Sequence, residues 1–381
     1  MQDTLMDIRA SLATGTNVTG GVAGVGGGAE IQKKIDTMIV DTINRGVDLR
    51  PLVSRKPTNQ LTYFWVLRKD LQSTNSVVFQ STEGASGTPY YSTKYQCYAQ
   101  CKSLRSDYEV SNLMIAGSSS FYDALADEAQ CALDSLKLYE ERCMISGDET
   151  TGGYGLANSY IGLYDALRWH TSNGGDTEAT AAHRMQSTTA RYGLTPASGT
   201  THLDVSYVVA GTAGTATGVL ELPHLNESIT RSNKHGGKGH DRIFFCSEER
   251  VNEINELLQP QQRFAGTLNL EGGFTISTYK GIPIVGSRFM DLAGLTNTTS
   301  ASAGAVAESA GDNAMYLLDM DRIEFRVLNG VDTQHVSVIN HQHGATDYGR
   351  SDTSGGFFKI YGTFVVKSFN SHVVIWNLTA P

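Results

Sequence analysis

The sequence predicts an α+β fold, arranged as one large domain or as two or three closely connected ones. Three observations support this prediction. Two strand-like runs, Gln60–Leu67 and Lys94–Val110, flank a polar segment that contains glycine. A long amphipathic pattern then extends from Phe121 to Ser146, and the second half of the chain mixes strand and helix patterns. With 381 residues, 40% of them hydrophobic and 18% charged, the chain can bury a sizeable core.

The first region, residues 1–59, is expected to be an N-terminal arm followed by a short helix. Glycine dominates Gly20–Gly28, and glycine brings no side chain to a core and loses much backbone entropy on ordering. The same run contains Gly24 and Gly26, but it follows no strand and lacks the lysine of a phosphate-binding loop. We therefore interpret it as an arm, and we predict the helix from Glu30 to about Ile43.

The second region, residues 60–111, is predicted to be an extended loop formed by a long two-stranded hairpin. Its 17-residue second run could reach roughly 55 Å. Because an isolated hairpin of this kind is only marginally stable in water, we expect it to lie on a neighbouring subunit. Aromatic residues carry much of the energy of such interfaces. The expected inter-subunit contacts are Tyr63, Trp65, Tyr90, Tyr91 and Tyr98.

The third region, residues 112–153, is built around a long helix from Phe121 to Ser146, which would measure about 39 Å. Ser120 is the expected N-cap, and Gly147 stands where a glycine cap would end the helix. Apolar residues recur along one face at helical spacing. The expected core positions of this helix are Phe121, Leu125, Ala132, Leu136, Tyr139 and Cys143.

The rest of the chain is expected to form a mixed α/β domain over residues 154–334, followed by C-terminal strands over 335–381 that return to the preceding domains. Helices are predicted after Pro223 and after Ser247. The predicted strands are Arg242–Cys246, Gly281–Gly286, Met315–Leu318, Ile323–Leu328, and Phe357–Trp376 with a break near Asn370.

Charge and cysteine content exclude several classes of protein. Thirty Lys and Arg residues against 39 Asp and Glu residues give a net charge of −9. A dedicated nucleic-acid binder is normally basic, whereas a container that merely encloses nucleic acid need not be. The first residues, Met1–Leu5, lack the basic and apolar character of a signal peptide, and no membrane span is expected. Five cysteines without a CxxC pair favour synthesis in a reducing cytoplasm.

No pattern of catalytic or cofactor-binding residues stands out, so the sequence predicts neither an enzyme nor a bound cofactor. Cys97 and Cys101 share one strand face, but a metal site would need further ligands, and only the distant His341 and His343 are available. We therefore expect no metal site. His240 and the nearby His235 flank a glycine-rich loop without an acid or a nucleophile at readable spacing, so we interpret it as a solvated loop.

The order of these elements resembles the major capsid proteins of tailed double-stranded-DNA bacteriophages, which have the Hong Kong 97-type (HK-97-like) fold. Phe121–Gly147 looks like the spine helix of that family. Phe244–Phe264 is similar to a strand and helix of its axial domain, and Gly281–Ser287 and Gly362–Lys367 resemble later strands. The resemblance implies an N-terminal arm, an extended loop, a peripheral domain with the spine helix and an axial α/β domain.

The resemblance also implies a function and partners. The chain would be a structural subunit of an icosahedral virion shell, made in the host cytoplasm, that self-assembles into hexamers and pentamers around double-stranded DNA. A separate scaffolding protein, a portal and possible decoration proteins would be its partners. One alternative is an encapsulin-like nanocompartment shell that loads a protein cargo. Others are a β-rich tail adhesin or carbohydrate-binding module, and an unrecognised enzyme.

Overall fold

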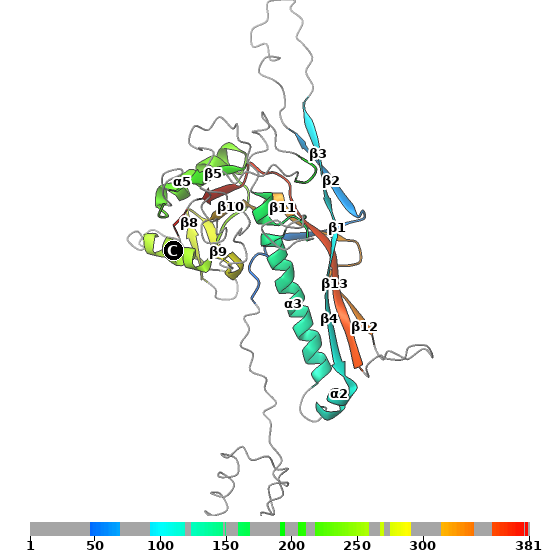
Figure 1. Ribbon diagram of the computed structural model, residues 1–381. Coiled ribbons are helices and arrows are strands. Elements are labelled where there is room, and N and C mark those ends of the chain that lie inside the picture. Colours follow the sequence, from blue (N-terminus) through cyan, green and yellow to red (C-terminus); the bar gives the residue numbers. More distant parts are fainter. Residues whose placement is uncertain are drawn as a thin grey trace, which may run out of the picture.

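The computed structural model describes residues 46–68, 92–118, 123–147, 149, 159–167, 191–194, 205–210, 218–258, 267–269, 275–290, 314–338, 353–376, 378 and 379. It has an elongated part built on a sheet and one long helix, a rounder α/β part beside it, and a hairpin that projects beyond both (Figure 1). The predicted helix from Glu30 to Ile43 and the glycine-rich run lie outside the described residues.

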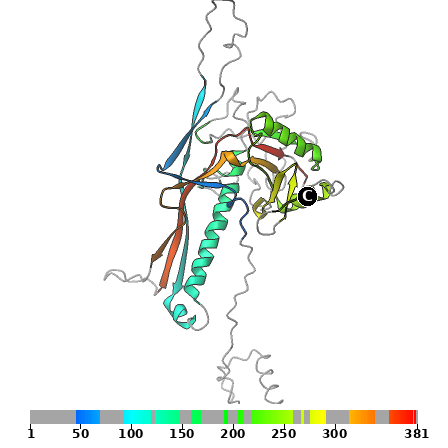
Figure 2. The same ribbon diagram turned by 180° about the vertical axis from the view of Figure 1, so that it is seen from behind.

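The elongated part is a five-stranded sheet with helix α3 (Ala124–Ser146) lying along it (Figures 1 and 2). Its central strand is the 14-residue β13 (Thr353–Val366), which pairs antiparallel with three other strands. These are β4 (Lys102–Ser111), β11 (Ile323–Leu328) and β12 (Gln334–Val338). Strand β1 (Ser54–Thr58) pairs parallel with β11, and the short helix α2 (Asn112–Ser118) follows β4 at the far end.

The rounder part is a seven-stranded mixed sheet. Its strands, in spatial order, are β5 (Ser206–Val209), β14 (Val373–Trp376), β10 (Met315–Asp319), β6 (Arg242–Cys246), β9 (Ile282–Gly286), β8 (Thr275–Tyr279) and β7 (Thr267–Asn269). Helices α5 (Leu222–Lys234) and α6 (Glu248–Leu258) pack against the sheet and share a buried apolar cluster with its side chains. Shorter helical segments are α4 (Leu163–Ala166), η4 (Arg288–Met290) and η6 (Met320–Arg322).

The central strands of this sheet are apolar on both faces because each face packs against a different core. Phe244 of β6 and its register partner Leu317 of β10 point into the core shared with α5 and α6. The next pair along, Phe245 and Tyr316, belongs to the other buried cluster, which also contains residues of α3 and the five-stranded sheet. This explains why Arg242–Cys246 is an uninterrupted apolar run after its first residue.

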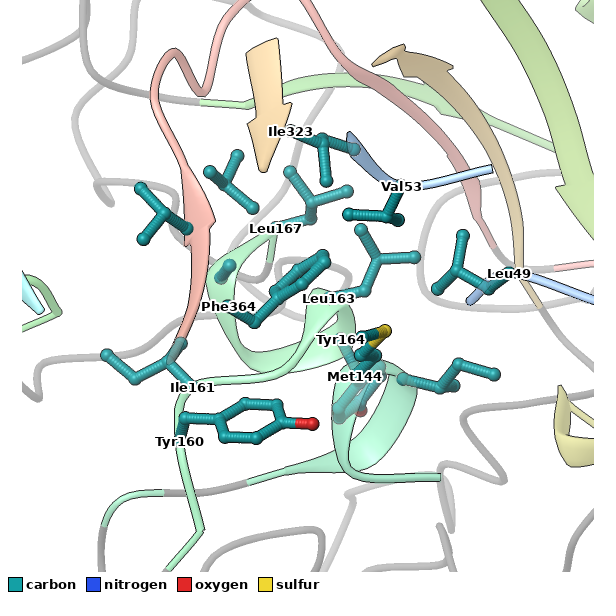
Figure 3. Close-up of a cluster of buried hydrophobic side chains, with 14 of the residues drawn as sticks. Leu49, Val53, Met144, Tyr160, Ile161, Leu163, Tyr164, Leu167, Ile323 and Phe364 are labelled. Carbon is teal, nitrogen blue, oxygen red and sulfur yellow. The ribbon is translucent and has the colours of Figure 1, made fainter. Parts of the chain in front are cut away.

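The larger core joins chain segments that are far apart in sequence (Figure 3). Leu49 and Val53 from the start of the described chain meet Met144 near the end of α3, Leu163 of α4 and Phe364 of β13. All five side chains are at most 4% exposed. Because the elongated and rounder parts share this cluster, they pack as one body rather than as separate units.

The predicted hairpin forms, but it is shorter than expected. Strand β2 (Thr62–Arg68) pairs antiparallel with β3 (Lys94–Gln100). The chain then leaves the hairpin after Cys101, whose N–H donates to the carbonyl of Leu61. The prediction of a single strand from Lys94 to Val110 is wrong, since β4 pairs with β13 in the five-stranded sheet. Leu104 and Val110 are buried there, which stabilises β4 more than an exposed loop would.

The long helix also differs from its prediction in two details. It begins at Ala124, and its N-cap is Asp123, whose carboxylate accepts the N–H groups of Leu125 and Ala126, while Ser120 and Phe121 lie outside the described residues. Ala132, Leu136 and Cys143 are buried and Leu125 is half-buried. The expected core position Tyr139 is instead 44% exposed. In the last turns of the helix the buried side includes Glu140 and Glu141 instead of Tyr139. A search for apolar residues at helical spacing does not find this side, because both residues are charged.

Gly147 ends this helix, but not as a left-handed glycine cap, since its φ of −63° suits any residue. Glycine is required because an added Cβ would lie 2.4 Å from the carbonyl oxygens of both Cys143 and Tyr160. We expect Gly147→Ala to lower the free energy of unfolding by about 3 kcal/mol, measured by urea denaturation. Gly117→Ala in α2, where a Cβ meets nothing within 4 Å, is the control and should be neutral or slightly stabilising. An equal effect of both changes would contradict this explanation.

The remaining predicted elements are confirmed with small shifts of their ends. The chain changes sheet between β13 and β14, near the predicted break at Asn370. The C-terminal strands therefore belong to different sheets. Strand β13 lies at the centre of the five-stranded sheet, and β14 lies between β5 and β10 in the seven-stranded sheet.

Candidate assembly surface

The projecting hairpin carries an exposed apolar patch on one face, which we call the hairpin face and define as Phe64, Val66 and Tyr98. Phe64 is 48% exposed, Val66 62% and Tyr98 47%. Phe64 and Tyr98 are register partners on β2 and β3, with ring centroids 6.2 Å apart. Large apolar side chains gathered on one side of a projecting element are typical of an interaction site.

The opposite face of the same hairpin is packed on its own subunit. Trp65 is 8% exposed, and its ring lies edge-on to that of Tyr192, with 5.1 Å between centroids. Cys97, the register partner of Trp65, is completely buried. Tyr63 stacks on Trp65, and the guanidinium of Arg326 lies over the Tyr63 ring at 4.3 Å. Both faces of β2 are thus apolar, but the described part of the chain covers only the inner one.

The structure therefore separates the predicted inter-subunit contacts. Trp65 is corrected to an internal core residue, and Tyr63 is a half-buried residue on that same inward face. Tyr98 lies on the hairpin face, while Tyr90 and Tyr91 lie outside the described residues. Phe64 and Val66, which are exposed, were not among the predicted contacts because the prediction considered one face of the strand only. The unbroken apolar run Tyr63–Leu67 was the available signal, since a strand covered on both faces shows no alternation.

A second exposed apolar group lies on α2, at the end of the elongated part opposite the hairpin (Figure 1). Leu113 is 84% exposed and Met114 47%. The two ends of the elongated part thus both present apolar side chains.

The chain that enters the body from the N-terminal side is held on the long helix by two adjacent acids. The carboxylate of Glu141 accepts the N–H groups of Asp48 at 2.7 Å, Leu49 at 3.1 Å and Arg50 at 3.4 Å. Glu140 is completely buried and binds the guanidinium groups of Arg50 at 2.6 Å and Arg55 at 2.7 Å. These contacts fix residues 48–55, near the start of the described chain, on the long helix.

A third acid, Glu324 of β11, binds strand β1 to the sheet. It is nearly buried and pairs with Lys56 of β1, with Lys367 at 2.8 Å and with Arg326. Burial by itself would raise the pKa of Glu324, but the hydrogen bonds from Lys367 and Lys56 and the charge of Arg326 hold it below its ordinary value. Glu324 therefore stays ionised and contributes stability at neutral pH.

Several of the residues considered for metal or catalytic chemistry lie within the described part of the chain. Burial raises the pKa of Cys97 to about 12, so its thiol stays protonated at neutral pH and is a poor ligand. His341 and His343 lie outside the described residues. His240 has no acid at readable spacing in the sequence, but the fold supplies one, because its Nδ1 lies 2.8 Å from Oδ2 of Asp319, 79 residues away. Among the described helices, none is both long and apolar enough to cross a membrane.

Solved structures with the same arrangement are shells. The capsid of cyanophage A-1(L) matches with a TM-score of 0.60 at 13% identity, over 93% of this chain and 98% of that one. The capsid of a native GTA particle matches with a TM-score of 0.58 at 11% identity, over 95% and 100%. The holo-SrpI encapsulin complex of Synechococcus elongatus PCC 7942 matches with a TM-score of 0.53 at 12% identity, over 92% of this chain and 94% of that one. The chain therefore has the HK-97-like fold of shell-forming proteins.

The sequence then identifies the family. The model of the family described as SU10 major capsid protein matches residues 25–379, and the chain belongs to this family. It is a structural shell subunit of a bacteriophage virion. No relative was found among curated proteins. The family and the fold both differ from a β-rich adhesin or carbohydrate-binding module.

Proposed function

We propose that copies of this chain form hexamers and pentamers of an icosahedral shell around double-stranded DNA, and that the chain has no catalytic task. In this proposal the hairpin face lies on the adjacent subunit of the same ring. The observation that supports it best is the two-sided hairpin, whose inner face packs on its own subunit through Trp65 while its outer face leaves Phe64 and Val66 exposed.

The magnitudes favour many weak contacts over one strong contact. Fully burying a side chain such as Phe64 or Val66 contributes about 1.5–3 kcal/mol. Association costs roughly 4–15 kcal/mol, so a single hairpin contact cannot hold two subunits together by itself. In a closed ring each subunit both donates and receives a hairpin, and further apolar groups such as Leu113 and Met114 of α2 add to the contact. This arrangement favours assembly that is cooperative and depends on concentration.

The net charge of −9 is compatible with a shell that encloses DNA without gripping it, since strong binding to phosphates needs a basic surface. The resemblance to the capsid proteins of tailed bacteriophages implies a separate scaffolding protein, a portal and possible decoration proteins as partners, with synthesis in the host cytoplasm. The encapsulin-like alternative shares the fold, and the family match favours the virion.

Electron microscopy and light scattering of the purified chain test this proposal. Rings of five or six subunits, or closed shells, are expected either for the chain alone or after a scaffolding protein is added. DNA that survives nuclease treatment in particles from infected cells would support the viral shell, whereas an enzyme cargo would support the nanocompartment. A monodisperse monomer or trimer that a scaffolding protein does not change would overturn the proposal.

A further inference from the structure

Three potential metal ligands meet beside one end of the two central strands β6 and β10 of the seven-stranded sheet. One ring nitrogen of His240 and one carboxylate oxygen each from Asp319 and Asp321 all lie within 4.8 Å of one another. His240 precedes β6, Asp319 ends the neighbouring strand β10, and Asp321 belongs to η6. These segments are held by backbone contacts, since the N–H of Met320 donates to the carbonyl of Asp241 at 2.8 Å and Asp319 is the register partner of Arg242. The ligand positions are therefore set by the sheet.

The buried carboxylate of Asp319 has fewer hydrogen-bond partners than a buried acid normally has. Its side chain is completely buried, and Oδ2 is 2.8 Å from His240. Its Oδ1 has no hydrogen-bond partner among the described residues. The neighbouring His372 accepts the backbone N–H of Asp319 at its Nδ1, 3.0 Å away, and leaves Oδ1 of the Asp319 carboxylate without a partner in the described part of the chain. A buried acceptor without a partner is rare in proteins, and an ion bound at this carboxylate would satisfy it.

We propose that His240, Asp319 and Asp321 bind a divalent transition-metal ion such as Mn²⁺ or Zn²⁺. Two carboxylates balance the charge of one divalent ion, and an imidazole nitrogen beside carboxylate oxygens suits these ions better than Ca²⁺ or Mg²⁺, which prefer oxygen alone. Metal–ligand distances of about 2.0–2.2 Å place the ligand atoms roughly 3–4 Å from one another. The three side chains therefore need to move only slightly closer together to bind an ion. This differs from the sequence-based expectation, which considered the cysteines and found no metal site.

The bound ion takes the place of the hydrogen bond between His240 and Asp319, since a histidine nitrogen that coordinates a metal carries no proton. It connects the loop before β6 with the turn after β10, both next to the middle of the seven-stranded sheet. Because the unfolded chain lacks this arrangement, metal binding stabilises the folded subunit. The proposal concerns subunit stability and does not depend on how the shell assembles.

Titration of the tag-free chain, stripped with a chelator, tests the site. With Mn²⁺ as the probe, electron paramagnetic resonance should show one ion bound per chain through loss of the free-ion signal. Calorimetry with Zn²⁺ should give the same stoichiometry, and either ion should raise the unfolding temperature. Asp321→Ala removes an exposed ligand without disturbing the core and should weaken binding at least about tenfold.

The matched control is Asp107→Ala, which removes an equally negative, exposed side chain from β4, far from the site in sequence. It should bind Mn²⁺ as the wild type does. His240→Gln, which leaves both acids in place, should weaken binding as Asp321→Ala does. The proposal is overturned if the wild type binds neither ion, or if both ligand variants bind as tightly as the Asp107→Ala control.

Discussion

Replacing Phe64 and Val66 together with serine is expected to give a folded subunit that no longer closes into shells. Both side chains are about half exposed or more in the subunit, so their loss should change its free energy of unfolding by less than about 1 kcal/mol. In the assembly, the lost apolar burial should amount to about 2–4 kcal/mol for each contact. Since 1.4 kcal/mol corresponds to tenfold, each contact weakens roughly 30-fold or more, and every ring repeats the loss.

Light scattering across a concentration series, with urea denaturation of the same samples, separates the two effects. Gln96→Ser is the matched control because Gln96 lies on the same outer face, is the register partner of Val66, and contributes little apolar surface. It should assemble like the wild type. Shells formed by the double variant at wild-type concentration would show that the hairpin face is not an assembly contact.

Glu140→Gln is expected to lower the free energy of unfolding by about 2–3 kcal/mol. The change leaves two guanidinium groups, those of Arg50 and Arg55, without the buried charge that they share. Breaking a fully buried pair costs about 3–5 kcal/mol, and we expect less here because both arginine side chains are 21% exposed and keep some water. Arg55 also retains its pair with Asp332, which limits the loss further.

Urea denaturation at neutral pH measures this effect, and Asp134→Asn on the same helix is its control. Asp134 pairs with Lys137 one turn away, and the Lys137 side chain is 33% exposed. Such a pair contributes roughly 0.3–0.5 kcal/mol. If Glu140→Gln and Asp134→Asn have the same small effect, Glu140 does not hold Arg50 and Arg55 on the helix.

The parts of the fold that follow from local patterns were predictable. Helical spacing and capping predicted α3 to within a few residues, and the apolar run Arg242–Cys246 predicted a buried strand. Strand β4 was missed because its assignment depends on β13, which lies some 250 residues further along the chain. No local pattern distinguishes a strand that continues a hairpin from one that joins another sheet.

The candidate sites depended even more on contacts between distant residues. The composition of β2 marked it as an interaction element, but only the position of Tyr192 shows which of its faces is covered. The roles of Glu140 and Glu141 depend on a chain segment about 90 residues upstream. His240 and Asp319 are likewise brought together only by the pairing of β6 with β10.

A cryo-electron microscopy reconstruction of the assembled shell, at a resolution that shows side chains, tests the hairpin contact most directly. We expect the adjacent subunit to cover Phe64, Val66 and Tyr98, while Trp65 keeps its contact with Tyr192 of its own chain. A shell in which the hairpin face stays open to solvent would contradict this expectation.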